Sequence, residues 1–219
     1  MGQYYAPVII GGDGSSGPRA RWWFSAHMYG NGLKLMEHSY VGNDFVRAVE
    51  TFLRLDGGMR LVWAGDYADP EPDGRNLWRH TMTETGDDHD YSRCVAISSA
   101  LEPLYPGYES TLERLAAMSH RVEVELASDA ECRYVVNLDT EQYVDTESAP
   151  QAEPCWEARI HPLPLLTCEG NGRGGGDYHG TPAVIGAWAR ARVTVSARAP
   201  QGFAELDFAA ALAGAEVRQ

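Results

Sequence analysis

The chain has 219 residues, of which 44% are hydrophobic. This composition supports one large or two small folded domains and excludes a wholly disordered protein. Its 31 acidic residues outnumber 18 Lys and Arg, giving a formal net charge of -13 and a pI of about 4.9. That charge repels phosphate backbones and anionic lipids, which argues against non-specific nucleic-acid binding. Because no long apolar run and no secretory signal occurs, we expect a cytoplasmic protein without membrane contact.

The cysteines argue for the same compartment. They are widely spaced, and no C-x-x-C pair signals a zinc site or a redox dithiol. We therefore expect free, buried thiols in a reducing environment. The four residues are Cys94, Cys132, Cys155 and Cys168.

Two strands and a helix are predicted in the first quarter of the chain. Residues 4–10 and 21–29 are apolar and aromatic runs on either side of a glycine-rich stretch, which predicts an antiparallel meander. From Asn43 the apolar residues recur with helical spacing, Asn43 can cap the helix, and Gly57 can end it. Residues 59–64 return to strand character. The apolar stripe of the helix consists of Phe45, Val46, Val49, Phe52 and Leu53.

A long polar insertion is predicted at about residues 69–130. Its first part, residues 69–90, is rich in charge, Pro and Gly and should run over the surface. Ser110 and Glu113 have the spacing of a capping box, which predicts a short helix reaching Met118. Alternating apolar and charged residues then predict a strand over 122–126.

The last third of the chain predicts mostly strands. Residues 134–144 have the pattern of a hairpin, 146–154 of a loop, 185–195 of a strand and 203–208 of a final strand before a fraying tail. Since no regular alternation of strands and helices occurs, we predict an α+β fold. It should be a single domain, residues 1–219, with a mainly antiparallel sheet and one or two helices packed on it. Trp63 and Trp188 should lie on strands beneath the helix.

The glycine-rich segment 170–176 is the most unusual part of the sequence. Five glycines in seven residues give up much backbone entropy on folding, which is tolerated where the main chain approaches another group closely. Exposed amides in such turns can form an anion-binding nest, and an arginine can clamp a phosphate or carboxylate. A ligand-free surface turn is the plainer alternative. The predicted binding residues are Asn171, Gly172, Arg173, Gly174, Gly175, Asp177, Asp66 and His161.

Known nucleotide motifs do not explain this segment. Residues 170–175 match G-x-G-x-x-G by letter, but no helix pattern follows to receive a pyrophosphate. No Lys-Ser or Lys-Thr pair follows either, which excludes a Walker A loop. The segment therefore predicts an anion site without assigning a cofactor.

Acid and imidazole side chains flank the same segment. Asp177, His179 and His161 are near it in sequence, and Asp66, Glu37 and His38 are further candidates if the fold brings them together. Such a set can transfer protons or hold a divalent ion, but the spacing typical of zinc sites is missing, and we predict no metal. No Ser or Cys nucleophile is indicated. We expect the segment beside the end of strand 59–64, so that Asp66 and Asp177 edge one pocket.

Several segments also carry a family resemblance. They are residues 1–5 (MGQYY), 31–40 (NGLKLMEHSY), 63–68 (WAGDYA), 134–137 (YVVN), 161–167 (HPLPLLT) and 170–178 (GNGRGGGDY). Together they resemble a family of proteins from bacterial genomes and their phages or prophages that has no established activity. The resemblance implies an intracellular protein that a phage or prophage can carry, and it assigns no catalytic residue. Residues 69–130 are longer than in shorter relatives, so relatives need not share one ligand.

Two functions stay open from the sequence. We favour an intracellular protein that binds a small anionic, nucleotide-like molecule through the glycine-rich segment and Arg173. The alternative is a hydrolase or nucleotide-processing enzyme that uses Asp66, Asp177 and the histidines. A third reading is an interaction protein without a small ligand. The sequence identifies neither a cofactor nor an oligomeric state.

Overall fold

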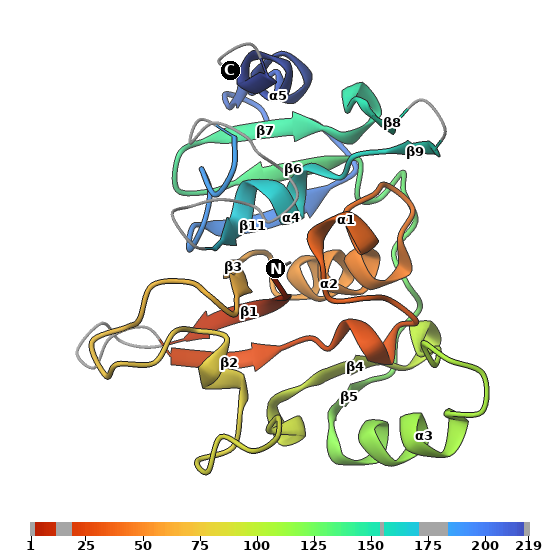
Figure 1. Ribbon diagram of the computed structural model, residues 1–219. Helices are drawn as coiled ribbons and strands as arrows, with labels where there is room; N and C mark the ends of the chain where they lie inside the picture. The colour runs from red at the N-terminus through yellow and green to blue at the C-terminus, as the bar shows by residue number, and fades with distance from the viewer. Residues whose placement is uncertain (1–2, 12–18, 154–155, 171–183, 217–219) are drawn as a thin grey trace.

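The computed structural model describes residues 3–11, 19–153, 156–170 and 184–216, and its largest element is a mixed sheet (Figure 1). In this described part the sheet has eight strands, in the order β12-β7-β6-β11-β3-β1-β2, with β10 beside β3. Most pairs are antiparallel; β10 with β3 and β12 with β7 are parallel. The strands are β1 (Tyr5–Gly11), β2 (Arg19–Trp23), β3 (Met59–Gly65), β6 (Tyr134–Asn137), β7 (Gln142–Asp145), β10 (Cys168–Glu169), β11 (Arg192–Ser196) and β12 (Ala204–Glu205).

Helices and two small sheets complete an α+β fold, as predicted. In Figure 1, α3 lies at one end of the molecule with β4 and β5, and α5 lies at the other end beside β7. The helices are α1 (Leu35–His38), α2 (Asp44–Leu55), α3 (Glu109–Met118), α4 (Pro162–Thr167) and α5 (Phe208–Glu216). The small sheets pair β4 (Val95–Ile97) with β5 (His120–Val122), and β8 (Gln151–Glu153) with β9 (Trp156–Arg159).

Helix α2 forms as its sequence predicts. The Asn43 side chain accepts hydrogen bonds from the backbone N–H groups of Phe45 and Val46, which satisfies two donors at the helix start. Gly57 follows the helix with a φ of 70°, a value that favours glycine. The apolar stripe is buried and packs over the sheet, where Phe45 contacts Trp63 edge to face. This packing places α2 against the strand that ends at the candidate site.

The insertion at 69–130 is built onto the first hairpin. The indole Nε1 of Trp23 on β2 donates to the carbonyl oxygen of Asp90, and Trp23 also forms a β-bridge with Cys94. Residues 69–90 are not only a surface excursion, because five of their side chains are buried. These are Asn76, Leu77, Trp78, His80 and Thr81.

Five elements differ from the sequence expectations. Helix α3 begins at Glu109 after Tyr108, so Ser110 lies inside the helix and the predicted capping box is wrong. The predicted strand 185–195 begins only at Arg192; Trp188 before it is buried but lies in a turn. The tail forms α5 instead of fraying, and β8 lies in the expected loop 146–154. The expected strand 122–126 ends at Val122.

Two further expectations concern burial and membranes. Cys94, Cys132 and Cys168 are free and buried, as predicted, whereas Cys155 lies outside the described residues. Across the described ranges, no helix is long and apolar enough to cross a membrane.

Candidate functional site

Most of the predicted binding residues cannot be placed. The prediction that the glycine-rich segment and Asp177 edge a pocket with Asp66 therefore stays a prediction. Gly170, Asp66 and His161 are described. Outside the described residues lie Asn171, Gly172, Arg173, Gly174, Gly175, Asp177 and His179.

The described beginning of that segment lies at the end of β3. Strand β10 pairs in parallel with β3, with Glu169 opposite Ala64. A Cβ atom on Gly65 would lie 2.7 Å from the Glu169 carbonyl oxygen and 3.2 Å from the Gly170 Cα atom. Gly65 therefore permits this close approach of two backbones, and the chain leaves β10 next to Asp66.

Asp66 holds the end of β3 to the beginning of β1. Its Oδ1 atom accepts the Tyr4 backbone N–H at 3.1 Å, and its own N–H donates to the Tyr4 carbonyl oxygen at 3.0 Å. Burial raises the pKa of Asp66 above its ordinary value, although backbone hydrogen bonds to the ionised carboxylate oppose the shift. At least one oxygen of the Asp66 carboxylate therefore has a structural role, because it accepts a hydrogen bond from the Tyr4 backbone.

His161 faces the core. It caps α4, because its Nδ1 atom accepts the Leu163 N–H at 3.1 Å. Its Nε2 atom lies 3.0 Å from Oε1 of Glu50 on α2, and both side chains are almost completely buried. Among the described residues no hydrogen bond or ion pair joins His161 to Asp66, so the structure assigns them separate surroundings.

Glu37 and His38 are structural as well. The Glu37 carboxylate accepts the Lys34 backbone N–H at 2.9 Å, at the start of α1. The buried His38 ring accepts the Trp63 indole N–H on Nε2 and contacts the Gly32 carbonyl oxygen through Nδ1, both at 3.0 Å. Burial lowers the pKa of His38 to about 4, so the ring is neutral near pH 7.

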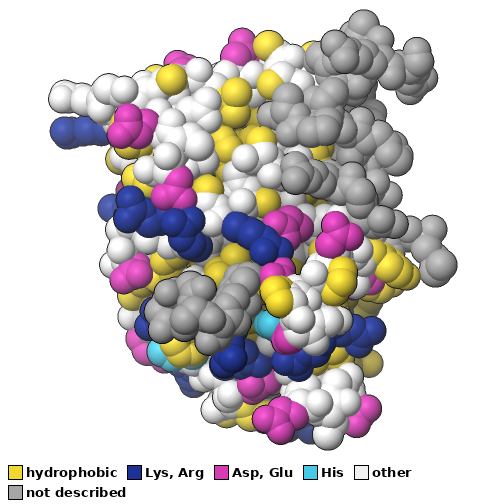
Figure 2. Space-filling model, turned by 90° about the vertical axis from the view of Figure 1, so that its left-hand side faces the viewer, with side chains coloured by type: hydrophobic (Ala, Val, Ile, Leu, Met, Phe, Trp, Pro, Cys, Tyr) yellow, Lys and Arg dark blue, Asp and Glu magenta, His cyan; other side chains and the backbone are white. Residues whose placement is uncertain are grey.

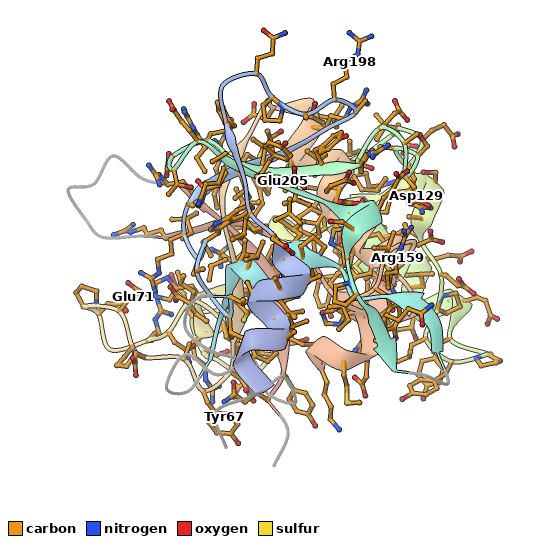
Figure 3. All side chains as sticks on the ribbon, turned by 90° about the horizontal axis from the view of Figure 1, so that it is seen from above. Tyr67, Glu71, Asp129, Arg159, Arg198 and Glu205 are labelled. Atoms are coloured by element: carbon orange, nitrogen blue, oxygen red, sulfur yellow. The ribbon has the colours of Figure 1, made fainter. Side chains whose placement is uncertain are left out.

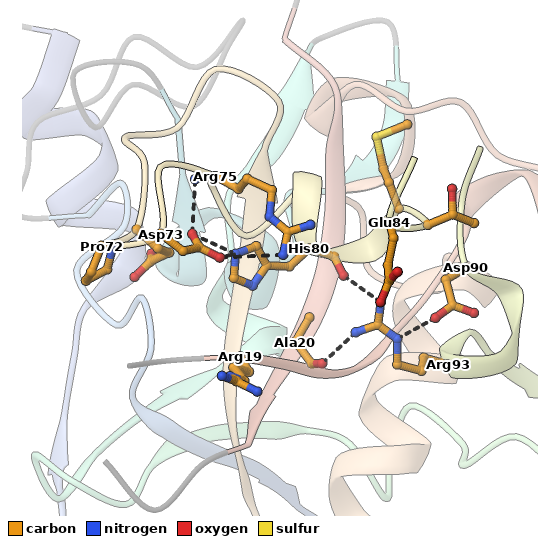
Figure 4. A pocket seen from close by; sticks show the side chains of 12 residues that line it. Arg19, Ala20, Pro72, Asp73, Arg75, His80, Glu84, Asp90 and Arg93 are labelled. Atoms are coloured by element: carbon orange, nitrogen blue, oxygen red, sulfur yellow. Dashed lines mark hydrogen bonds and ion pairs between the residues drawn. The ribbon is translucent and has the colours of Figure 1, made fainter. Parts of the chain in front are cut away.

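A different site emerges where residues 71–93 meet the beginning of β2. A polar pocket of about 460 Å³ opens there, in the size range of small-molecule sites (Figure 4). Figure 2 shows Lys and Arg side chains gathered across the middle of one face of the molecule. The pocket is lined by Arg19, Ala20, Glu71, Pro72, Asp73, Arg75, His80, Met82, Thr83, Glu84, Asp90 and Arg93.

Arg93 is braced in one wall of the pocket. Its Nε atom donates to Asp90 at 2.8 Å, and its two Nη atoms donate to the carbonyl oxygens of Ala20 and His80 at 3.0 and 2.9 Å. Burial acts to raise the pKa of Asp90, but hydrogen bonds from Ser92 and Arg93 outweigh it and hold this pKa below its ordinary value. Since a guanidinium has five N–H bonds, these three leave two for a ligand.

Asp73 and His80 form a second ionic group in the pocket. The His80 Nε2 atom lies 3.1 Å from Asp73 Oδ2, and the Arg75 guanidinium lies 3.5 Å from the same atom. A hydrogen bond from the Arg75 backbone N–H is the largest influence that lowers the pKa of Asp73. His80 is 8% exposed, so its orientation is fixed by the surrounding protein.

Arg19 and Glu84 differ from these paired groups. Within the described residues, no hydrogen bond or ion pair engages the Arg19 guanidinium or the Glu84 carboxylate. Both side chains are exposed at the pocket. Among the described lining residues, the site therefore holds one cation, Arg19, and one anion, Glu84, that have no ionic partner.

An ionic bridge connects this pocket to β10. The Arg190 Nε and Nη2 atoms donate to the Glu169 carboxylate at 2.5 and 2.7 Å, and Arg190 also pairs with Glu71. The hydrogen bonds that Arg190 donates to Glu169, and secondarily to Glu71, raise the pKa of Arg190. The Glu71 side chain is only 7% exposed. Because Glu169 precedes Gly170, the bridge joins the pocket wall to the residue where the glycine-rich segment begins.

The sequence analysis missed this pocket. Its arginines come from three segments, and no single motif contains them; only the charged run 69–90 beside Arg19 and Arg93 in an acidic chain was a signal. In the described ranges, no group of three or more His, Cys, Asp or Glu residues is arranged to hold a metal ion. No family model, curated protein or solved structure matches the chain.

Proposed function

We propose that the protein binds a small anionic molecule in the pocket formed by Arg19, Arg75 and Arg93. The observation that supports this most directly is the Arg19 guanidinium, which has no partner among the described residues yet lines a ligand-sized pocket. A guanidinium recognises carboxylate and phosphate oxygens with two parallel hydrogen bonds. Because three of its N–H groups hold the Arg93 guanidinium in place, the other two can add further donors without a large loss of side-chain entropy.

The pairing of charges in the pocket, and not their sum, supports an anion: the described lining holds three arginines and four carboxylates, but three of the carboxylates have basic partners. Asp73 pairs with Arg75, Asp90 pairs with Arg93, and Glu71 shares Arg190 with Glu169, so their negative charges are at least partly compensated. Glu84 remains as the opposing charge, at the exposed rim. Because the pocket lining is strongly polar, a compact, highly charged ligand fits it better than a large apolar one.

We propose that the glycine-rich segment 170–176 supplies additional hydrogen-bond donors to the same anion. The bridge through Glu71, Arg190 and Glu169 supports this, since it links the pocket to Gly170. If Arg173 holds the anion, Arg173→Ala should weaken binding while the free energy of unfolding stays unchanged. The family resemblance favours an intracellular, phage- or prophage-borne protein and selects no ligand, because that family has no established activity.

Hydrolysis of a bound phosphate or carboxylate ester is the second candidate. It is favoured by one observation, the buried His80 ring oriented by Asp73 at the pocket wall. A histidine oriented in this way can act as a general base on a water molecule. His80→Gln should abolish turnover and leave ligand affinity unchanged if the protein is an enzyme; a binding protein shows no turnover in either form.

The decisive experiment is a calorimetric titration with inorganic phosphate, AMP and ADP on three proteins. The wild type is compared with Arg19→Ala and with Arg198→Ala, which removes the same charge from an exposed site away from Glu71 (Figure 3). Arg19→Ala should lower affinity about ten- to hundredfold, as expected for a hydrogen-bonded charge. Arg198→Ala should have little effect.

Two outcomes would contradict the proposal. Equal losses in Arg19→Ala and Arg198→Ala would show only a general effect of net charge. Absence of saturable binding for every anion would favour an interaction protein without a small ligand. A thermal shift on adding the anion is a parallel readout, because a ligand of the native state raises stability.

A further inference from the structure

A second, chemically different pocket lies between α3 and the short 3₁₀ helices η1 (Ala26–Met28) and η3 (Tyr91–Arg93). Its volume is about 220 Å³, and it is lined mainly by aromatic and apolar side chains, among them Tyr91, Tyr105, Tyr108 and Leu112. None of the described residues that line it is Lys or Arg. Tyr105 and Tyr108 are 60% and 56% exposed, so their rings form an open wall rather than part of the core.

A rigid turn holds the two exposed rings. Tyr105, Pro106, Gly107 and Tyr108 have the residues of a type II β-turn, with proline second and glycine third. Gly107 has a φ of 90°, and the Tyr108 N–H donates to the Tyr105 carbonyl oxygen at 3.3 Å. The Gly107 N–H donates to Glu109 Oε1 at 3.2 Å, which fixes the turn to the first residue of α3.

The ring geometry suits a cation. The ring centroids of Tyr105 and Tyr108 are 5.9 Å apart, and their planes meet at 59°. A cation is attracted to the face of an aromatic ring within about 6 Å of its centroid. A group placed between these two rings can therefore satisfy that limit for both at once.

The electrostatic surroundings are also favourable. Residues 99–118 contain Glu102, Glu109 and Glu113 but a single basic residue, Arg114. Partial desolvation, opposed by Glu37, lowers the pKa of His27 at the pocket wall, which disfavours a positive charge on its ring. The net charge of -13 adds a long-range attraction for cations.

We propose that this pocket binds a small, soluble organic cation with a quaternary ammonium group. The apolar lining accommodates the methyl groups, the tyrosine rings face the charge, and no lining guanidinium or ammonium repels it. This site is separate from the arginine pocket, and neither proposal depends on the other.

The test is a titration of the full chain with choline and with 3,3-dimethyl-1-butanol, its uncharged isostere, followed by NMR of the tyrosine ring signals. Choline should saturate the site and bind several-fold more tightly than the isostere. Tyr105→Leu and Tyr108→Leu should each weaken choline binding about three- to tenfold, because each removes one ring face. Tyr105→Phe should retain binding, since the ring is kept. Tyr4→Leu, at another exposed tyrosine, is the matched control.

Three results would overturn the proposal. Equal binding of choline and its isostere would show an apolar pocket without cation recognition. No saturable choline binding by the folded protein, or losses in Tyr105→Leu no larger than in Tyr4→Leu, would reject the site. Sedimentation with phosphatidylcholine vesicles without binding of free choline would assign the pocket to a lipid headgroup instead of a soluble cation.

Discussion

The Nε2 atom of His161 lies 3.0 Å from Oε1 of Glu50, and the two side chains are 3% and 5% exposed. The distance is that of an ion pair, but the angles do not form a hydrogen bond, so Glu50 Oε1 has no hydrogen-bond donor among the described residues. Because His161 Nδ1 accepts the Leu163 N–H, the ring proton is on Nε2, facing the carboxylate. Glu50 thus depends on His161 as its nearest polar partner.

His161→Leu should therefore destabilise the protein strongly. It takes from the buried Glu50 carboxylate its nearest polar neighbour, which costs about 1–3 kcal/mol, and it also removes the cap of α4. His161→Asn restores an acceptor for the Leu163 N–H and should recover about 1 kcal/mol of this loss. Urea denaturation measures the difference.

The double variant Glu50→Leu with His161→Leu is the control for charge. It should be more stable than His161→Leu alone, because no buried charge is left in it. A double variant that is less stable than His161→Leu would show that packing, and not charge, dominates at this contact.

Stability should fall between about pH 6.5 and pH 4 because of His38. Its pKa is lowered to about 4 in the folded chain by burial, whereas an unfolded histidine titrates near 6.5. In this interval the unfolded chain binds more protons than the folded one, so the free energy of unfolding rises with pH and is lost on acidification. Across the whole interval the loss is on the order of 3 kcal/mol.

His38→Phe isolates this contribution. Protonation of His38 Nε2 would break its contact with the Trp63 indole N–H, and phenylalanine has no such step. The free energy of unfolding of the His38→Phe variant, measured by urea denaturation, should change less between pH 7 and pH 4.5 than that of the wild type. Identical differences would assign the acid sensitivity to other groups.

Arg190 combines an ionic role with an unusual backbone. Its φ of 65° is in the left-handed region, and its guanidinium pairs with the carboxylates of both Glu71 and Glu169. Arg190→Ala should cost about 1–3 kcal/mol, since the buried Glu71 carboxylate loses its partner. Arg190→Gly loses the same ion pairs but relieves the backbone, so it should be about 1 kcal/mol more stable than Arg190→Ala. Thermal unfolding tests this order, and equal stabilities would mean that the backbone is not strained.

Sequence patterns predicted correctly those elements whose ends are fixed by residues within or next to the element itself. Asn43 and Gly57 delimit α2 as expected, and the turn of the 134–144 hairpin forms because Asn137 Oδ1 accepts two backbone N–H groups. The strand expected from residue 185 failed because Gly186 and Arg190 have positive φ values, which extended strands do not allow. Apolar alternation alone does not reveal such turns.

Helix α4 and the arginine pocket required tertiary information. The sequence analysis predicted no helix over residues 162–167, which contain two prolines. Both prolines lie in the first turn, where a missing N–H is tolerated, and His161 supplies the cap. The pocket unites Arg19, His80 and Arg93, which are distant in sequence and meet only because the insertion packs on β2. Only the fold shows that the Arg19 guanidinium has no partner in the part of the chain that the structure describes.

Glu84 provides the last prediction, because it opposes the proposed ligand. A carboxylate about 8 Å from a bound anion repels it by about 0.5 kcal/mol in water, so Glu84→Gln should raise phosphate affinity roughly twofold. Glu113→Gln removes the same charge from α3, away from the pocket, and should change affinity less. The gain should shrink as salt is raised from about 0.01 M to about 1 M, since the Debye length falls from about 30 Å to about 3 Å. Calorimetric titration at two salt concentrations measures both effects, and a loss of affinity in Glu84→Gln would mean that the ligand carries a cationic group which Glu84 binds.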